Sequence, residues 1–154
     1  MLKILSLDPS GTGTTGICLI NGSKITFKEF KSKAWKEHLT YLAQLNKTFQ
    51  PQVILFEHTN YINSRGKDMT GLLKLLGALE CLPLDQIESI PVHQVKELSQ
   101  QLFKGTKKLA EIEFKPGRGK GWIFQGKKIS VHQLEAYLVY YLWKEKGGKY
   151  ENTK

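Results

Sequence analysis

The sequence has few cysteines, no long apolar run and a shortage of acidic residues, and each shortage narrows the class of protein. No stretch approaches the roughly 18 consecutive apolar residues that a membrane-spanning helix needs. The first seven residues lead directly to Asp8, without the basic start and extended apolar segment of a secretory signal peptide. These features predict an intracellular protein that is neither secreted nor embedded in a membrane.

Cysteine contributes little to the expected architecture. Cys18 and Cys81 have the spacing of neither a metal site nor a disulfide framework. We predict that both are small buried apolar residues in a reducing compartment. Stability must therefore come from an apolar core, for which 154 residues in one domain suffice.

The shortage of acid leaves a strongly basic chain. Fourteen Asp and Glu against 23 Lys and Arg give a net charge of +9. The segment from Lys96 to Lys128 holds nine basic residues and three Glu, so it alone contributes +6. This balance favours a polyanionic partner such as nucleic acid, although a solvated basic face on a protein with another task would look the same.

Hydrophobic periodicity predicts an α/β fold with a mixed sheet. Apolar segments indicate strands over 2–7, 16–20 and 24–30, joined in part by an Asn21-Gly22 turn, which is typical of an antiparallel hairpin. Helices and strands then alternate. We expect helices at 35–49, 67–81, 92–103 and 130–144, and strands at 52–57 and 86–90.

We find no linker that divides the chain. The prediction is a single domain over 1–145, followed by a frayed tail over 146–154. Residues 104–130 form a basic, glycine-rich insert that we interpret as a hairpin or a mobile loop.

Two acids follow buried strands directly. Asp8 ends the first strand and Glu57 ends the fourth. If these strands are parallel neighbours, both carboxylates emerge at the same edge of the sheet, where ligands gather. His132 and Glu135 lie three residues apart on one face of the last helix, in its first turn. Together these four side chains could converge on divalent cations, for which oxygen ligands suit magnesium or manganese.

Each of these residues has an ordinary alternative. An acid at a strand end is often a loop cap, and Glu135 could simply favour the positive end of the helix dipole. A phosphate-binding loop at 11–16 is a weaker alternative, because the segment lacks the Gly-Lys-Ser/Thr ending of a P-loop and lies between hairpin strands.

Five motifs resemble the RuvC-type Holliday junction resolvases, in the same order along the chain. They cover most of 2–103 and 130–143. The motifs are Ile4-Leu5-Ser6-Leu7-Asp8-Pro9-Ser10 with Thr14-Thr15-Gly16, Val53-Ile54-Leu55-Phe56-Glu57, Leu73-Lys74-Leu75-Leu76-Gly77, Pro91-Val92-His93-Gln94-Val95-Lys96, and His132-Gln133-Leu134-Glu135-Ala136.

The resemblance implies a ribonuclease-H-like fold of five strands, three antiparallel and then parallel ones, with helices on both faces. It also implies a homodimer that acts in DNA recombination and repair, in the cytoplasm or another DNA-containing compartment. Its reaction would be symmetric paired nicking of four-way junctions with two magnesium ions per active site, for which manganese would substitute. Asp8, Glu57, His132 and Glu135 become the catalytic metal ligands, with Asp8 bridging the two ions.

The chain departs from the family pattern at three places. His132 stands where Asp is frequent, and Glu135 is one methylene longer than the usual Asp. The insert at 104–130 does not match the bacterial pattern, which suggests a divergent or phage-type member.

The resemblance and the charge together predict a DNA-binding surface and a dimer interface. Tyr61 would stack on an opened base, or else cover a helix as an ordinary loop residue. Trp122 and Phe124 are expected to pack within the insert rather than act as DNA wedges. The residues predicted to contact phosphates are Lys96, Lys104, Lys107, Lys108, Lys115, Arg118, Lys120, Lys127 and Lys128. The residues predicted for the interface, or alternatively for the core, are Met69, Leu72, Leu73 and Leu76.

Two other functions remain open. One is a different ribonuclease-H-like nuclease, acting on RNA–DNA hybrids or on a wider range of structures. The other is a junction-binding module without catalysis, although the four ligand-type side chains argue against a decayed site.

Overall fold

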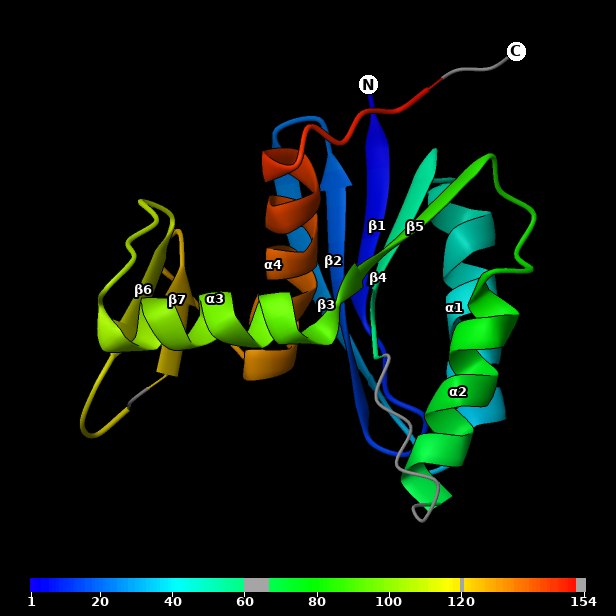
Figure 1. The fold of residues 1–154 in the computed structure, drawn as a ribbon, viewed down its shortest axis with the longest axis horizontal. Helices are drawn as coiled ribbons and strands as arrows, with labels where there is room; N and C mark the ends of the chain where they lie inside the picture. The colour runs from blue at the N-terminus through cyan, green and yellow to red at the C-terminus, as the bar shows by residue number, and fades with distance from the viewer. Residues whose placement is uncertain (60–66, 120, 152–154) are drawn as a thin grey trace.

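The structure is a computed structural model that describes residues 1–59, 67–119 and 121–151. Within these residues the centre of the molecule is a five-stranded sheet in the order β3-β2-β1-β4-β5 (Figure 1). The first three strands are antiparallel, and β4 and β5 run parallel to β1. Their bounds are β1 Lys3–Asp8, β2 Thr14–Asn21, β3 Lys24–Lys31, β4 Val53–His58 and β5 Gln86–Pro91.

Helices cover both faces of this sheet because its central strands are apolar on both sides. Leu5 and Leu7 of β1 belong to the cluster beneath α1 and α2, whereas Ile4 belongs to the cluster beneath α4. The mixed sheet and its two helical layers confirm the predicted fold class. The helices are α1 Trp35–Phe49, α2 Lys67–Leu79, α3 Val92–Lys104 and α4 Val131–Glu145.

The outer strand β3 differs from the central ones. Its residues alternate between exposed and half-buried, which is the pattern of a strand with one wet face. The turn that precedes it contains Gly22 at a φ of 61°, as the Asn-Gly signal predicts. The pairing of β1 with β2 places Asp8 opposite Gly16, at the end of these strands that is remote from this turn.

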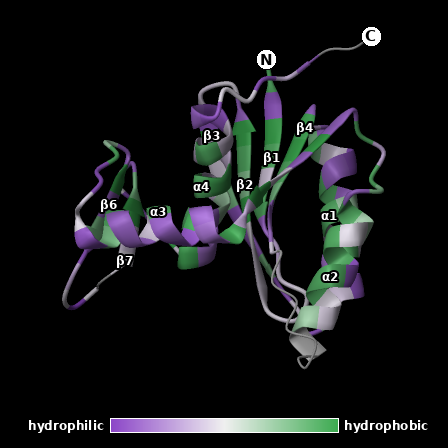
Figure 2. Ribbon diagram, in the orientation of Figure 1, coloured by the Kyte–Doolittle hydropathy of each residue, from purple (hydrophilic) through white to green (hydrophobic). Residues whose placement is uncertain are grey.

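The basic insert is more regular than the hairpin or mobile loop expected from its sequence. It contains a second antiparallel sheet in the order β6-β7-β8, which lies at the far end of α3 from the main sheet (Figure 1). Phe124 packs edge-on against Phe27 and Tyr137, and this anchors the small sheet to the domain. The strands are β6 Ile112–Lys115, β7 Gly121–Phe124 and β8 Lys127–Ile129. Figure 2 shows hydrophobic residues along the central strands and hydrophilic ones over much of α3.

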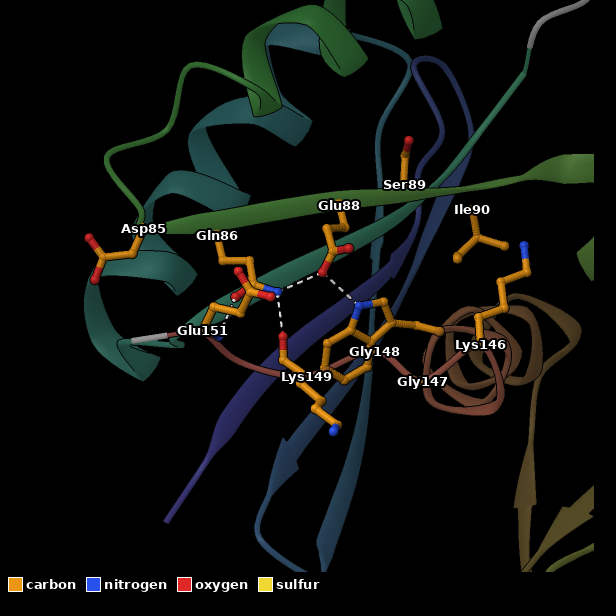
Figure 3. A pocket seen from close by; sticks show the side chains of 11 residues that line it. Asp85, Gln86, Glu88, Ser89, Ile90, Lys146, Gly147, Gly148, Lys149 and Glu151 are labelled. Atoms are coloured by element: carbon orange, nitrogen blue, oxygen red, sulfur yellow. Dashed lines mark hydrogen bonds between the residues drawn. The ribbon is translucent and has the colours of Figure 1, made fainter. Parts of the chain in front are cut away.

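The described part of the segment expected to fray is tied to β5. Gly147, at a φ of 80°, and Gly148 return hydrogen bonds to Lys144 and Trp143, which is the Schellman closure of a helix. Gln86 then donates from its amide to the carbonyl oxygen of Lys149 at 2.8 Å. Figure 3 shows the hydrogen bond between Gln86 and Lys149 beside a cavity of about 630 Å³.

The two cysteines differ in burial. Cys18 is buried and burial strongly raises the pKa of its thiol, but Cys81 is exposed, so the prediction that both are buried is wrong for Cys81. Cys81 follows the end of α2 in a turn and therefore misses the core. Among the described residues, no helix is both long and apolar enough to cross a membrane.

Candidate metal centre

Three carboxylates meet at one edge of the main sheet. Asp8 is the last residue of β1, Glu57 lies in β4, and Glu135 lies in α4. Leu7 pairs with Phe56 in the parallel β1–β4 register, so the next residues, Asp8 and Glu57, leave the sheet side by side. One oxygen of each carboxylate lies within 4.8 Å of the others.

The first two turns of α4 are held against β1 and β2 by close contacts to the helix backbone. The Ser6 hydroxyl, fully buried in β1, donates to the carbonyl oxygen of Ala136 at 2.7 Å. Gly16 of β2 lies so close to the carbonyl of His132 that a side chain there would overlap it. At the helix start, Ser130 and Gln133 form a reciprocal capping box. These contacts fix where Glu135 enters the site.

The cluster is electrostatically unfavourable in the absence of a cation. Burial, followed by the charges of Asp8 and Glu135, raises the pKa of Glu57 from 4.5 to about 8. Burial also raises the pKa of Glu135. Among the described residues, Glu57 Oε2 is buried without a hydrogen-bond partner. A buried acceptor of this kind is costly unless a cation or a proton satisfies it.

Lys96 supplies one positive charge to the cluster. Its ammonium lies 2.5 Å from Glu135 Oε1, and it reaches the site from the first turns of α3. Burial alone lowers the pKa of Lys96, but the hydrogen bond to Glu135 and the nearby carboxylates raise it overall. The sequence prediction placed Lys96 among phosphate contacts and gave no sign of this ion pair.

His132 touches the cluster through Asp8. Its Nδ1 lies 3.3 Å from Asp8 Oδ2, and this hydrogen bond raises the pKa of the imidazole. The structure thus brings three of the four predicted ligands together directly and places His132 beside one of them. An imidazole in contact with a carboxylate can orient that carboxylate as well as bind a cation itself.

The predicted phosphate-contacting residues outside the cluster lie on the insert and the end of α3. All those described there are exposed: Lys104, Lys107, Lys108, Lys115, Arg118, Lys127 and Lys128. Tyr61 and Lys120 lie outside the described residues. Trp122 and Phe124 are buried in the small sheet, as predicted for packing residues.

The fold is ribonuclease-H-like, and similar solved structures share it over almost the whole chain. Thermus thermophilus RuvC in complex with a Holliday junction substrate has a TM-score of 0.57 at 14% identity, covering 96% of this chain and 97% of that one. A second T. thermophilus RuvC structure has a TM-score of 0.52 at 17% identity, covering 95% and 97%.

YeaZ from Pseudomonas aeruginosa is also similar, with a TM-score of 0.50 at 9% identity and coverage of 96% and 94%. The sequence matches no family model, and no curated protein is significantly similar to it. Because differently named proteins share the architecture at such low identity, the likeness defines the fold, and the activity must be argued from the site.

Proposed function

We propose that this protein is a divalent-cation-dependent endonuclease that resolves four-way DNA junctions by paired nicking, acting as a homodimer. The observation that carries the proposal is the convergence of Asp8, Glu57 and Glu135 within 4.8 Å at the edge where β1 and β4 end. The T. thermophilus RuvC that shares the fold was seen bound to a Holliday junction substrate, which supports branched DNA as the substrate class.

The donor set fits a hard divalent cation. Three carboxylates offer only oxygen ligands, and the unpartnered Oε2 of Glu57 is an acceptor that a cation would satisfy. Asp8, Glu57 and Glu135 would hold magnesium or manganese, with two ions per site in the proposal, and His132 would complete the set beside Asp8. When bound, the cations supply the charge that activates water and stabilises the departing 3′ oxygen of a phosphodiester.

The remaining side chains of the site have supporting tasks. His132 holds the Asp8 carboxylate in one orientation through its Nδ1 contact. Lys96 compensates the carboxylates through Glu135 and is half exposed, so it can also meet a phosphate that enters the site. The exposed basic residues of the insert would bind flanking phosphates, which positions DNA without reading its sequence.

A homodimer would match the twofold symmetry of a four-way junction, because it presents one site to each of two opposed strands. The structure separates the residues predicted for the interface. Leu72 and Leu76 pack into the core beneath α2, whereas Leu73 is 37% exposed. The proposed interface is therefore the face of α2 that carries Leu73.

The decisive experiment is cleavage of a labelled immobile four-way junction beside a matched linear duplex, with and without magnesium. We expect magnesium-dependent nicks in opposed strands for the wild type, and binding without cleavage for Asp8→Asn. Asp85→Asn, an exposed position just before the start of β5, is the matched control and should cleave normally.

Each other outcome assigns a different activity. Equal cutting of linear duplex or of an RNA–DNA hybrid would indicate a less selective nuclease on this fold. Tight junction binding without cleavage under any divalent cation would indicate a non-catalytic binding module. Normal turnover by Asp8→Asn would remove the carboxylate cluster from the mechanism.

A further inference from the structure

A second cavity lies at the end of α3 that is remote from the carboxylates. It has a volume of about 350 Å³ and is enclosed by the end of α3, the segment 105–110 and the small sheet. Its wall is mainly apolar and includes Leu102, Leu109, Ile112, Phe114 and Trp122. The volume is at the lower end of the range of cavities that bind small organic groups.

The lining of this cavity is more basic than acidic. Lys107 and Lys108 both line it, against Glu113 as the acidic member among the described lining residues. The Lys107 ammonium lies 5.5 Å from the centre of the Tyr141 ring, a cation–π contact that keeps it near the surface of α4. An apolar wall with two lysines in its lining suits a ligand with a flat apolar part and an attached anion.

Aromatic rings extend the wall outward. Phe103 is 58% exposed although it is a large apolar residue, and its ring centre lies 4.7 Å from that of Phe114. Phe114 in turn lies 5.0 Å from Trp122, which is buried. The exposed ring therefore continues an aromatic series that begins inside the cavity.

We propose that this cavity binds an unpaired base of a single-stranded DNA segment, with Lys107 and Lys108 on the adjoining phosphates. Stacking on aromatic side chains beside a basic groove is how proteins hold single strands without sequence preference. A base inside an intact duplex is stacked on its neighbours and cannot enter. The inference deepens the proposed function, because it supplies a site for bases that open near a branch point.

The test measures binding of single-stranded DNA in the absence of divalent cation, so that cleavage plays no part. The probes are a fluorescent short oligothymidylate and an abasic strand of the same length, which keeps the phosphates and removes the bases. We expect the wild type to bind the base-bearing strand about tenfold more tightly. Ala110→Trp, an exposed position that lines the cavity, should fill it and abolish that preference while leaving abasic binding unchanged.

Two further variants complete the design. Ala34→Trp, also exposed but located before α1, is the control and should behave as the wild type. Lys107→Gln with Lys108→Gln should weaken both strands alike. Equal affinity of the wild type for the two strands would overturn the proposal even if junction cleavage is established. A second result would also overturn it. If an acidic peptide that contains one leucine binds more tightly than the oligothymidylate, and Ala110→Trp abolishes the binding of that peptide, the cavity serves a protein partner.

Discussion

At the scale of single residues, Glu57 couples the site to the stability of the cation-free protein. Its pKa rises from 4.5 to about 8 on folding, so its contribution favours the folded state below pH 4.5 and is lost as the pH rises through 8. Glu57→Gln should therefore raise the free energy of unfolding above pH 8 by on the order of 1–3 kcal/mol and change it little near pH 4.5.

Urea denaturation of both proteins with a chelator present measures this difference. Glu80→Gln, at an exposed position after α2, is the control and should show no pH-dependent difference from the wild type. A Glu57→Gln effect of the same size at both pH values would mean that folding does not raise the pKa of the Glu57 carboxyl.

Lys96 competes with a cation for the same carboxylates. Replacing it in Lys96→Met removes the ammonium from Glu135 and should lower the magnesium concentration at half-saturation by roughly fivefold, as expected for a half-exposed ion pair worth ~1 kcal/mol. The measurement is the thermal unfolding midpoint during a magnesium titration. Lys104→Met, at the other end of α3, should titrate as the wild type does, and weaker magnesium binding by Lys96→Met would contradict the competition.

At the scale of elements, the sequence predicts best where a single pattern decides. The acids that follow apolar residues place the end of β1 at Asp8, as observed, and the end of β4 one residue early, since β4 runs to His58. Both strands are recognisable from the sequence because each is apolar on both faces. The strands of the insert are harder to predict from the sequence, because β6 has four residues and β8 has three, too few to show a periodicity. They become strands through pairing with β7, and the contact of Phe124 with Phe27 joins segments far apart in sequence.

The ion pair of Lys96 with Glu135 also joins segments that only the tertiary structure brings together. It depends on β5 lying parallel to β4. Because of this, α3, which follows β5 directly, begins at the same edge of the sheet at which Glu57 lies. The sequence contained a usable signal, because Pro91 marks where the strand becomes a helix, but only the strand order turns that signal into a contact. The close approach of Gly16 to α4 had one local signal, a glycine inside a strand, but this signal fits a bulge or a bend equally well and does not name α4 as the neighbour.

Substitution of Gly16 measures how rigidly α4 packs against β2. In Gly16→Ala the new methyl group would overlap the His132 carbonyl, so α4 must shift and the protein should lose about 1–3 kcal/mol of stability. Gly77→Ala is the matched control within α2, where nothing lies within 4 Å of the new methyl group. It should gain about 0.5–1 kcal/mol from helix propensity. Chemical denaturation compares the two, and equal effects would mean that the start of α4 yields freely.

At the scale of the whole molecule, the net charge of +9 is unevenly distributed over the surface. If Lys127 and Lys128 of β8 each contact a phosphate, the double change to Gln should reduce the slope of log affinity against log salt by about 2 for a junction. Changing Lys24 and Lys47, exposed residues at the end of the main sheet remote from the carboxylates, should leave the slope unchanged. An unchanged slope in the β8 variant would remove the small sheet from the DNA-binding surface.

The proposed dimer has one requirement that a monomer lacks, because two opposed strands must be cut within one encounter. Leu73→Glu places a charge on the exposed face of α2 without entering the core, so the subunit should stay folded. We expect light scattering to report a monomer and junction cleavage to change from paired to single nicks. Thr48→Glu, on an exposed position of α1, should stay dimeric. If Leu73→Glu is still dimeric and cuts in pairs, the interface lies elsewhere than on this face of α2. A wild type that is already monomeric yet cuts in pairs would show that two independent subunits meet on the DNA.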